Sequence, residues 1–323
     1  MDLTTTVLMV LLFVLGNVTE GEVLHYNFYD KSCPQLENIV RAGLVPLFVT
    51  DPTSPAALLR LMFMHDCQVQ GCDASILVDP IEGNVSSKMA SGRNFGIQKR
   101  ELISIVKSMV EAACPQQVSC ADILILAARE AVAMSGGPHI EVPLGRKDSF
   151  TAPNYQQADA WIPPATTGVD DMLHIFTSKG MTIQESVALI GAHTLGVTHC
   201  ASILNRLYKA EGDKAHQEME PGCEAFLMLN CPEWSLTSNI SFVLNDPTAF
   251  IFDNLYYKNA MGGRGVLRID AEMVSDPRTA QIVKHFASDW DDFFRAFSSA
   301  FVKLSTSGSL NQGVIRKRCN VLD

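Results

Sequence analysis

The chain has 323 residues, of which 47% are hydrophobic, so it can bury a sizeable core in one large or two modest domains. Its formal net charge of −10 at pH 7 disfavours nucleic acids and anionic membrane surfaces as partners. The short basic cluster Arg316-Lys317-Arg318 is too small to change that conclusion.

An apolar run at residues 7–15 is followed by small and polar residues. It is shorter than the roughly 20 residues of a membrane-spanning helix and is typical of a secretion signal. We expect residues 1–21 to be a signal peptide cleaved between residues 18 and 21, although Asp2 stands where a basic residue is usual. No later stretch is long and uncharged enough to span a membrane, so none is expected in the mature chain.

The chain contains nine cysteines, and their spacing matches no zinc-finger pattern. Because a secreted chain meets oxidising conditions, we interpret them as a disulfide framework, but sequence alone cannot choose among the possible pairings. The glycosylation sequons Asn84-Val85-Ser86 and Asn239-Ile240-Ser241 are compatible with secretion.

In chain order, the first predicted helix follows Cys33-Pro34 and has Leu36, Val40 and Leu44 on one side. A second helix is predicted to begin at Ser54, as N-cap, with Pro55 in its first turn.

This second helix is apolar except for Arg60 and His65, and it leads into an unusual loop. The loop has two cysteines five positions apart and oxygen-bearing side chains at Asp66, Asp73 and Ser75. Ca²⁺ prefers several oxygen ligands from a sharply turned loop, so this stretch is a candidate cation site.

Residues 79–97 are rich in Gly, Ser and Asn and predict a long loop, after which residues 101–113 return to helical spacing. Ser119 is placed to cap an apolar helix that reaches Met134 and stops at Gly136-Gly137. Four prolines make residues 138–168 irregular, and we expect a boundary there between domains at 22–165 and 166–323.

The second half contains one further candidate histidine. Thr182 and Glu185 form the sequence pattern of a capping box, and the helix that they start runs into Gly191-Ala192-His193. Small neighbours would let a flat, wide group approach the His193 ring. A final aromatic stripe at helical spacing is expected to be core, formed by Trp290, Phe293, Phe294, Phe297, Phe301 and Leu304.

Two stretches resemble the signatures of the secretory plant haem peroxidases (class III). Residues 60–75 are similar to the distal signature Arg-Leu-x-Phe-His-Asp-Cys-x-Val-x-Gly-Cys-Asp-Ala-Ser, and residues 191–196 to the proximal signature Gly-x-His-Thr-x-Gly. The resemblance covers essentially the whole mature chain. It implies a mainly α haem-peroxidase fold, with two helical domains, one haem b between them and four disulfides.

The resemblance also implies residue roles. His193 would hold the haem iron, and Asp270 would accept the other N–H of that imidazole. His65 would be the base that moves the peroxide proton, and Arg60 the cation that meets the developing negative charge. Pro163 matches the proline at the exposed haem edge where phenolic donors dock.

Two calcium sites and a disulfide pattern are implied in the same way. The distal site maps to Asp66, Val69, Gly71, Asp73 and Ser75. The proximal site maps to Thr194, Asn245, Thr248, Ile251 and Asp253. Because Asn245 replaces an aspartate of the family, we expect that site to be weaker. The implied disulfides are Cys33–Cys114, Cys67–Cys72, Cys120–Cys319 and Cys200–Cys231.

Cys223 has no counterpart in the family and is either a free thiol or a rival of Cys231 for Cys200. Asp122 and Arg146 match a buried ion pair that we interpret as structural. We assign no role to the other histidines, namely His25, His139, His174, His199, His216 and His285.

Met64 is the main departure, because it separates Arg60 and His65 by five positions where the family has four. Residues of an α-helix turn by about 100° each, so a spacing of four leaves two side chains about 40° apart and a spacing of five about 140°. Either the helix contains a π-bulge that absorbs one residue, which we favour, or one catalytic group is misplaced.

The support behind His65 also departs from the family. Ser87 replaces a glutamate, and Arg93 or Asn94 aligns with the asparagine that orients the histidine. His65 would then be less well oriented than in typical members. Gln68 in the loop also replaces a phenylalanine, and the sequence gives no account of its effect.

We therefore predict a secreted, monomeric peroxidase of the cell wall or vacuole that uses H₂O₂ to oxidise small phenolic donors in one-electron steps. The alternative is an extracellular haem- and calcium-binding protein that Met64 has made catalytically weak. A third hypothesis is a disulfide-rich secreted protein without haem.

Overall fold

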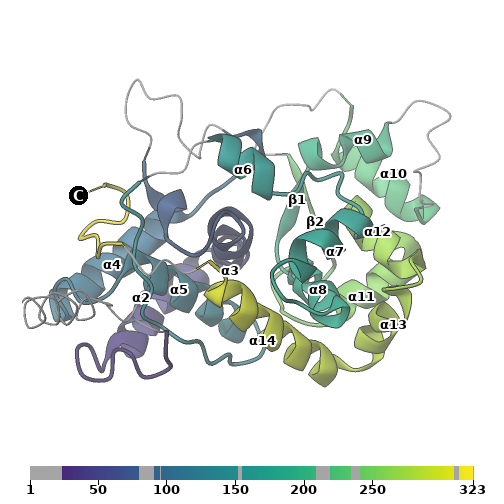
Figure 1. Cartoon of the computed structure of the whole chain (residues 1–323). Helices are drawn as coiled ribbons and strands as arrows, with labels where there is room; N and C mark the ends of the chain where they lie inside the picture. The colour runs from purple at the N-terminus through teal and green to yellow at the C-terminus, as the bar shows by residue number, and fades with distance from the viewer. Residues whose placement is uncertain are drawn as a thin grey trace, which may run out of the picture.

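The computed structural model describes residues 24–79, 91–94, 96–151, 155–208, 219–233, 241–308 and 313–322. The expected signal peptide, Asn84, Asn239, Ser87 and most of the loop at 79–97 lie outside these residues. The described part is mainly helical, as expected, and Figure 1 shows the long helix α14 running between a group around α2, α4 and α5 and a group around α7, α8 and α11–α13.

The α-helices are α2 (Leu36–Thr50), α3 (Ser54–Arg60), α4 (Arg100–Ala113), α5 (Cys120–Met134), α6 (Tyr155–Trp161), α7 (Val169–Thr177), α8 (Ile183–Ile190), α9 (Leu204–Leu207), α10 (Pro221–Asn230), α11 (Leu255–Asn259), α12 (Arg268–Ser275), α13 (Ala280–Ser288) and α14 (Trp290–Thr306). Two π-helical segments are η2 (Leu61–Cys67) and η8 (Ala260–Arg264). Short 3₁₀ segments are η3 (Ser75–Leu77), η5 (Gly92–Asn94), η6 (Gly191–Thr194) and η7 (Cys200–Ser202).

Strands β1 (Val197–His199) and β2 (Phe242–Leu244) form a small antiparallel sheet, in which Thr198 pairs with Val243. The sheet joins the segment that follows His193 to the segment that precedes Asn245. None of the described helices has the length and hydrophobicity that a membrane span requires.

Helix starts follow the capping residues that the sequence predicted, with one exception. Ser119 Oγ accepts the Asp122 N–H at 3.1 Å, and Thr182 and Glu185 make both hydrogen bonds of a capping box. At α3 the N-cap is Thr53 and not Ser54, and its side chain makes no capping bond. Ser54 is buried as the first residue of that helix, so its expected capping role is wrong.

The proline-rich segment 138–168, expected to be irregular, contains the helix α6. Ala158 of α6 and the adjacent Ile162 bury themselves against Val69 of the distal loop. Burial of this small apolar contact stabilises a helix that is too short to persist alone. The predicted domain boundary near residue 165 stays a prediction.

Helix α14 supplies much of the core. Phe293, Phe297 and Phe301 are fully buried, and the helix packs on α8, α13 and η2. Burial of each such side chain stabilises the fold by roughly 1.5–3 kcal/mol. Trp290, expected in the core, is instead 55% exposed, at the first position of the helix.

All nine cysteines lie in the described part of the chain, and the four predicted disulfides are present. They are Cys33–Cys114, Cys67–Cys72, Cys120–Cys319 and Cys200–Cys231. Cys223 remains a partly buried thiol, and burial raises its pKa. Each disulfide that closes a long loop stabilises the fold by about 2–4 kcal/mol.

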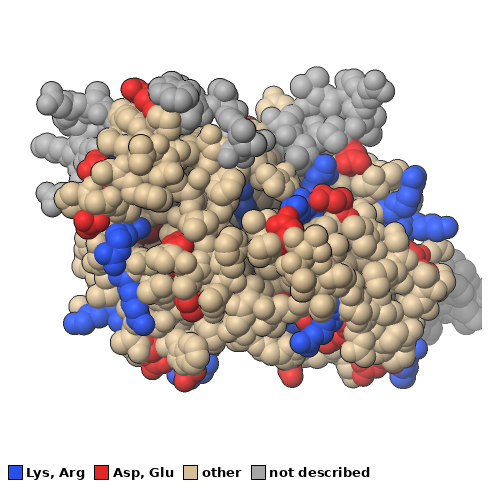
Figure 2. Space-filling view, turned by 180° about the vertical axis from the view of Figure 1, so that it is seen from behind, with Lys and Arg blue, Asp and Glu red and all other residues tan. Residues whose placement is uncertain are grey.

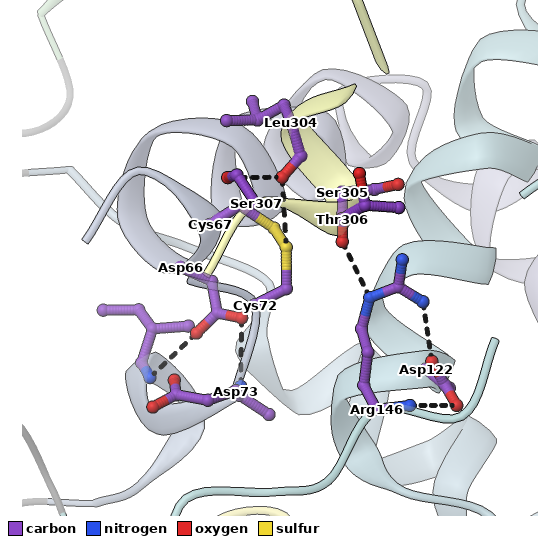
Figure 3. Close-up of a disulfide and its surroundings, with 12 residues drawn as sticks. Asp66, Cys67, Cys72, Asp73, Asp122, Arg146, Leu304, Ser305, Thr306 and Ser307 are labelled. Carbon is purple, nitrogen blue, oxygen red and sulfur yellow. Dashed lines mark hydrogen bonds and ion pairs between the residues drawn. A yellow bond between two sulfur atoms is a disulfide. The ribbon is translucent and has the colours of Figure 1, made fainter. Parts of the chain in front are cut away.

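Figure 3 shows how the C-terminal end of α14 is fixed to two other parts of the fold. Cys72 of the short disulfide lies with its Sγ 3.6 Å from the Leu304 carbonyl oxygen. The predicted buried ion pair is confirmed, because Arg146 donates to Asp122 at 2.8 Å, and the same guanidinium donates to the Ser305 carbonyl. Removing one partner would leave an uncompensated buried charge, at a cost of about 3–5 kcal/mol.

Candidate active site

The helix that carries Arg60 and His65 changes its winding between these two residues. It is α-helical as far as Arg60 and π-helical over Leu61–Cys67, where the Gln68 N–H donates to the Phe63 carbonyl five residues earlier. A π-turn contains one more residue than an α-turn, so it absorbs the extra residue. The predicted bulge is confirmed, and Arg60 and His65 follow each other across one wide turn instead of lying on nearly opposite faces.

His65 is buried and its ring is fixed through one nitrogen. Nδ1 lies 2.6 Å from Oδ1 of Asn94, the last residue of η5. An amide oxygen can only accept, so Nδ1 carries the proton and Nε2 has the lone pair. Asn94, and not Arg93, is therefore the residue that orients His65, so the expected loss of this support is wrong, while Ser87 lies outside the described residues.

Arg60 lies near the second half of the chain. Burial lowers the pKa of Arg60, and the pKa of His199 in β1 is lowered by burial first and then by the Arg60 charge. A side chain at Gly96 would collide with the His199 ring, so the backbone beyond Asn94 also reaches this strand. Figure 2 shows a hollow near the middle of the opposite face, with blue atoms of a Lys or Arg set deep in it.

His193 lies in η6 at the end of α8, and a buried carboxylate fixes its ring. Nδ1 donates to Oδ1 of Asp270 at 2.9 Å, and the same oxygen accepts the Tyr256 hydroxyl at 2.6 Å. Burial alone would raise the pKa of Asp270, but the His193 charge and the hydrogen bonds of His193, Tyr256 and Leu267 outweigh it and lower that pKa. Asp270 is therefore a carboxylate, and Nε2 of His193 is the nitrogen left for a ligand.

The small residues around His193 have reasons that the sequence did not reveal. A side chain at Gly191 would strike the Tyr257 hydroxyl and the Phe293 ring, so this glycine permits close packing behind the histidine. Gly196 has a φ of +90°, and a Cβ there would lie 2.7 Å from Ala56 of α3. The loop after His193 thus touches the helix of Arg60, and the two predicted signatures border one region.

The described residues fit a haem. His193 keeps 29% of its side chain accessible although Asp270 behind it is buried, so an oriented imidazole with a basic Nε2 is available to iron. The helix that the loop after His193 contacts through Ala56 offers a second oriented imidazole, His65, and a cation, Arg60.

The distal loop has the strained backbone of a tight cage. Gln70, Gly71 and Ala74 have positive φ values of 66°, 120° and 55°. Asp66 accepts the Ala74 N–H at 3.0 Å, and Asp73 accepts the Ser75 N–H at 3.0 Å. The carboxylates of Asp66 and Asp73 and the hydroxyl of Ser75 are buried together, while Val69 and Gly71 lie between them in the loop. Buried oxygens of this kind are suited to Ca²⁺.

The oxygen atoms gathered around Thr194 differ from the predicted proximal set. Thr194 Oγ1 lies 3.2 Å from Asp246, 3.4 Å from the Ile251 carbonyl and 3.4 Å from Asp253. Thr248 bonds to Asp246 through both its N–H and its hydroxyl.

Asn245 points elsewhere, since it accepts from Thr198 and donates to the Leu195 carbonyl. Asp246 therefore stands where Asn245 was expected, and the predicted loss of a negative charge is wrong. Burial and the Asp253 charge raise the pKa of Asp246 to about 6, as two carboxylates without a cation between them would. The sequence did contain a signal for this residue, because Asp246 directly follows Asn245. An alignment without a gap pairs Asn245 with the aspartate of the family and so misses Asp246.

Gln68, which had no explanation from the sequence, joins the distal loop to α6. It is buried, and its Nε2 donates to the Trp161 carbonyl at 3.2 Å. Pro163 follows two residues later and is partly buried. Because Gln68 is three residues after His65, its hydrogen bond attaches the segment of the predicted donor site to the distal loop.

Comparisons with known proteins agree with these features. The family model described as Peroxidase matches residues 40–289. The chain is 54% identical to Peroxidase 29 of Arabidopsis thaliana over 310 residues, which cover 94% of this chain and 91% of that protein. It is 37% identical to Peroxidase 17 over 98% of this chain and 95% of the relative, and 38% identical to Peroxidase 28 over 99% of each, both from the same plant.

Proposed function

Because the chain belongs to the peroxidase family and is a haem peroxidase, we propose that it is secreted and uses H₂O₂ to take single electrons from small phenolic donors. The observation that carries this proposal is the pair of oriented histidines. His65 is fixed by Asn94 and His193 by Asp270, in each case through Nδ1, so each presents Nε2.

His193 is the residue that would hold the haem, and Asp270 would keep its ring in the correct tautomer. Bound haem supplies the redox chemistry by which peroxide is reduced and donors are oxidised. The Asp270 carboxylate makes the imidazole a more electron-rich ligand. The Tyr256 hydroxyl and the Leu267 N–H hold that carboxylate in place.

His65 and Arg60 would act on peroxide. Nε2 of His65 takes a proton from the near oxygen of H₂O₂ and returns it to the departing oxygen, a role worth about 10²–10⁴ in rate. The Arg60 guanidinium stabilises the negative charge that develops on that oxygen. The π-helix supports this pairing, because it lets both residues border one site despite Met64.

Donors would dock beside Pro163, near the surface end of α6. The hydrogen bond from Gln68 to the Trp161 carbonyl supports this position, because it holds the end of α6 against the distal loop. Phenolic donors fit such a site, because a flat, weakly polar ring can lie against proline and lose one electron and one proton.

Calcium would occupy two sites that stiffen the histidine segments. The distal site comprises Asp66, Val69, Gly71, Asp73 and Ser75, directly after His65. The proximal site comprises Thr194, Asp246, Thr248, Ile251 and Asp253, directly after His193. Two carboxylates in the proximal set support an affinity close to that of the distal site.

Secretion is supported by the apolar amino-terminal run and by four disulfides, which persist in oxidising compartments. We place the mature protein outside the plasma membrane or in the vacuole, as a monomer.

The test is the rate at which haem-loaded enzyme oxidises a small methoxyphenol with H₂O₂, compared with the His65→Leu variant. The proposal expects a normal Soret band and a rate about 10²–10⁴ times that of the variant. A normal Soret band with equal rates would favour the alternative of a catalytically weak haem- and calcium-binding protein. A chain that takes up no haem would contradict both the proposed peroxidase activity and this alternative.

A further inference from the structure

An unbroken series of ring contacts runs from the protein surface to the proximal histidine. It begins at Trp290, which is 55% exposed, and ends at His193. The successive centroid distances are Trp290–Phe294 5.7 Å, Phe294–Phe293 5.5 Å, Phe293–Tyr257 5.1 Å, Tyr257–Tyr256 5.0 Å and Tyr256–His193 6.1 Å. All lie within the range in which aromatic rings interact directly.

The inner end of this series is built for proton-coupled oxidation. Tyr256 and Tyr257 are fully enclosed, and each hydroxyl already has an acceptor. Tyr256 donates to Asp270 at 2.6 Å and Tyr257 to the Val187 carbonyl at 3.0 Å. When Tyr256 loses an electron, its proton can move to Asp270 and return without any rearrangement.

The outer end carries a side chain that is readily oxidised. Tryptophan and tyrosine lose one electron far more easily than phenylalanine, so Trp290, Tyr257 and Tyr256 can each hold an oxidising equivalent while Phe293 and Phe294 fill the gap between them. A second branch leads from Phe294 through Phe252 and Phe297 to Phe63, but it contains only phenylalanines.

We propose that Trp290 is a second donor site, at which the enzyme oxidises phenolic groups carried on molecules too large to reach the haem edge. This inference rests on the proposed function, because the oxidant is the enzyme after its reaction with H₂O₂. One electron passes from the Trp290 indole along the rings to the oxidised centre, and the indole N–H proton goes to solvent. A phenolic group then returns one electron and one proton to Trp290 and leaves as a phenoxyl radical.

Charges around Trp290 suit this role. Asp289 and Asp291 flank it, and Asp292 is paired with His285 and Arg295. Excess negative charge stabilises an indole that has lost an electron and repels anionic donors. The site therefore selects neutral phenolic groups.

The first test locates the oxidising equivalents without measuring turnover. Haem-loaded enzyme receives a few equivalents of H₂O₂ without a donor, and peptide mass spectrometry measures oxygen addition at each aromatic residue. Tyr26 is the internal control, because it is 61% exposed and has no ring contact with the series in the described part of the chain. We expect oxidation at Trp290 to exceed that at Tyr26 by about tenfold or more and to fall in Tyr257→Phe, which keeps the ring but not the oxidisable hydroxyl. Equal oxidation of Trp290 and Tyr26, or no change in Tyr257→Phe, would overturn the proposal.

The second test separates the two donor sites. Trp290→Phe should oxidise a free methoxyphenol at the wild-type rate but oxidise the same phenol coupled to a large dextran at least about tenfold more slowly. Tyr26→Phe, the control at an exposed ring outside the series, should change neither rate by that amount. If Trp290→Phe oxidises the dextran-bound phenol as fast as Tyr26→Phe does, the proposal is wrong. If the wild-type enzyme oxidises neither donor, the proposed function itself has failed.

Discussion

His65 and His193 are held in the same way by different oxygens. Each ring is fixed through Nδ1, His65 by the neutral amide of Asn94 and His193 by the ionised carboxylate of Asp270. An amide fixes the tautomer without adding charge, so it leaves Nε2 of His65 as a proton acceptor. A carboxylate adds electron density to its partner, as a metal ligand requires. The difference supports the two proposed roles independently of the sequence signatures.

The largest expected effect comes from removing the base. His65→Leu should retain haem, because the His193 side is untouched, and should slow the reaction with H₂O₂ by about 10²–10⁴. Stopped-flow absorbance of the haem band measures the rate. Loss of the haem band in this variant would show that His65 and not His193 binds the iron.

Exchanging the two supporting oxygens should sharpen the comparison. In Asn94→Asp the new carboxylate stabilises the protonated form of the His65 imidazole, so less neutral base is present at low pH and the rate should recover as pH rises. In Asp270→Asn the iron ligand becomes less electron-rich, and the rate should fall by about 10–100-fold at every pH. The pH profile of the peroxide reaction distinguishes them, and identical profiles would contradict the assigned roles.

Deleting Met64 is expected to have a smaller effect. The wide turn over Leu61–Cys67 should become α-helical and restore a spacing of four between Arg60 and His65. The rate with H₂O₂ should then rise or stay within about tenfold of wild type, since the Cys67–Cys72 loop still anchors His65. A collapse of activity in a folded deletion variant would mean that the π-turn is required.

The smallest effect concerns the proposed calcium site beside His193. Free Ca²⁺ at about 100 times Kd should stabilise the wild type by roughly 2.7 kcal/mol, and Asp246→Asn should lose most of that increment at the proximal site. Because the pKa of Asp246 is raised to about 6, the ionised carboxylate destabilises the folded state at pH 7 when Ca²⁺ is absent. Without Ca²⁺, Asp246→Asn should therefore be at least as stable as the wild type.

Asn245→Ala is the matched control for this measurement. It removes the bonds to Thr198 and Leu195 but should keep the response to Ca²⁺. Denaturant titration with and without Ca²⁺ measures the free energy of unfolding of both variants. Loss of the response in Asn245→Ala alone would restore the original assignment.

The sequence predicted features that depend on local spacing. Residue type and count predicted the caps at Ser119 and Thr182 and the π-turn that contains Met64. The disulfides were predicted from the resemblance. It could not decide between Arg93 and Asn94, or between Asn245 and Asp246, because one gap in a loop shifts the register and only the folded chain shows which oxygen reaches its partner.

Tertiary packing also decided features that no local pattern contains. Helix α6 forms in a proline-rich segment because Ala158 meets Val69, and Gly191 is small because Tyr257 and Phe293 lie behind it. The exposure of Trp290 depends likewise on where α14 begins relative to its neighbours.

The central claim is that His65, held by Asn94 within a π-turn, is a working base opposite His193. The most direct measurement is the second-order rate constant for the first spectral change when H₂O₂ meets the haem-loaded wild type at pH 7. We predict a value in the range of efficient enzymes, about 10⁴–10⁸ M⁻¹ s⁻¹, and far above that of His65→Leu. A wild-type rate equal to that of His65→Leu would contradict the account.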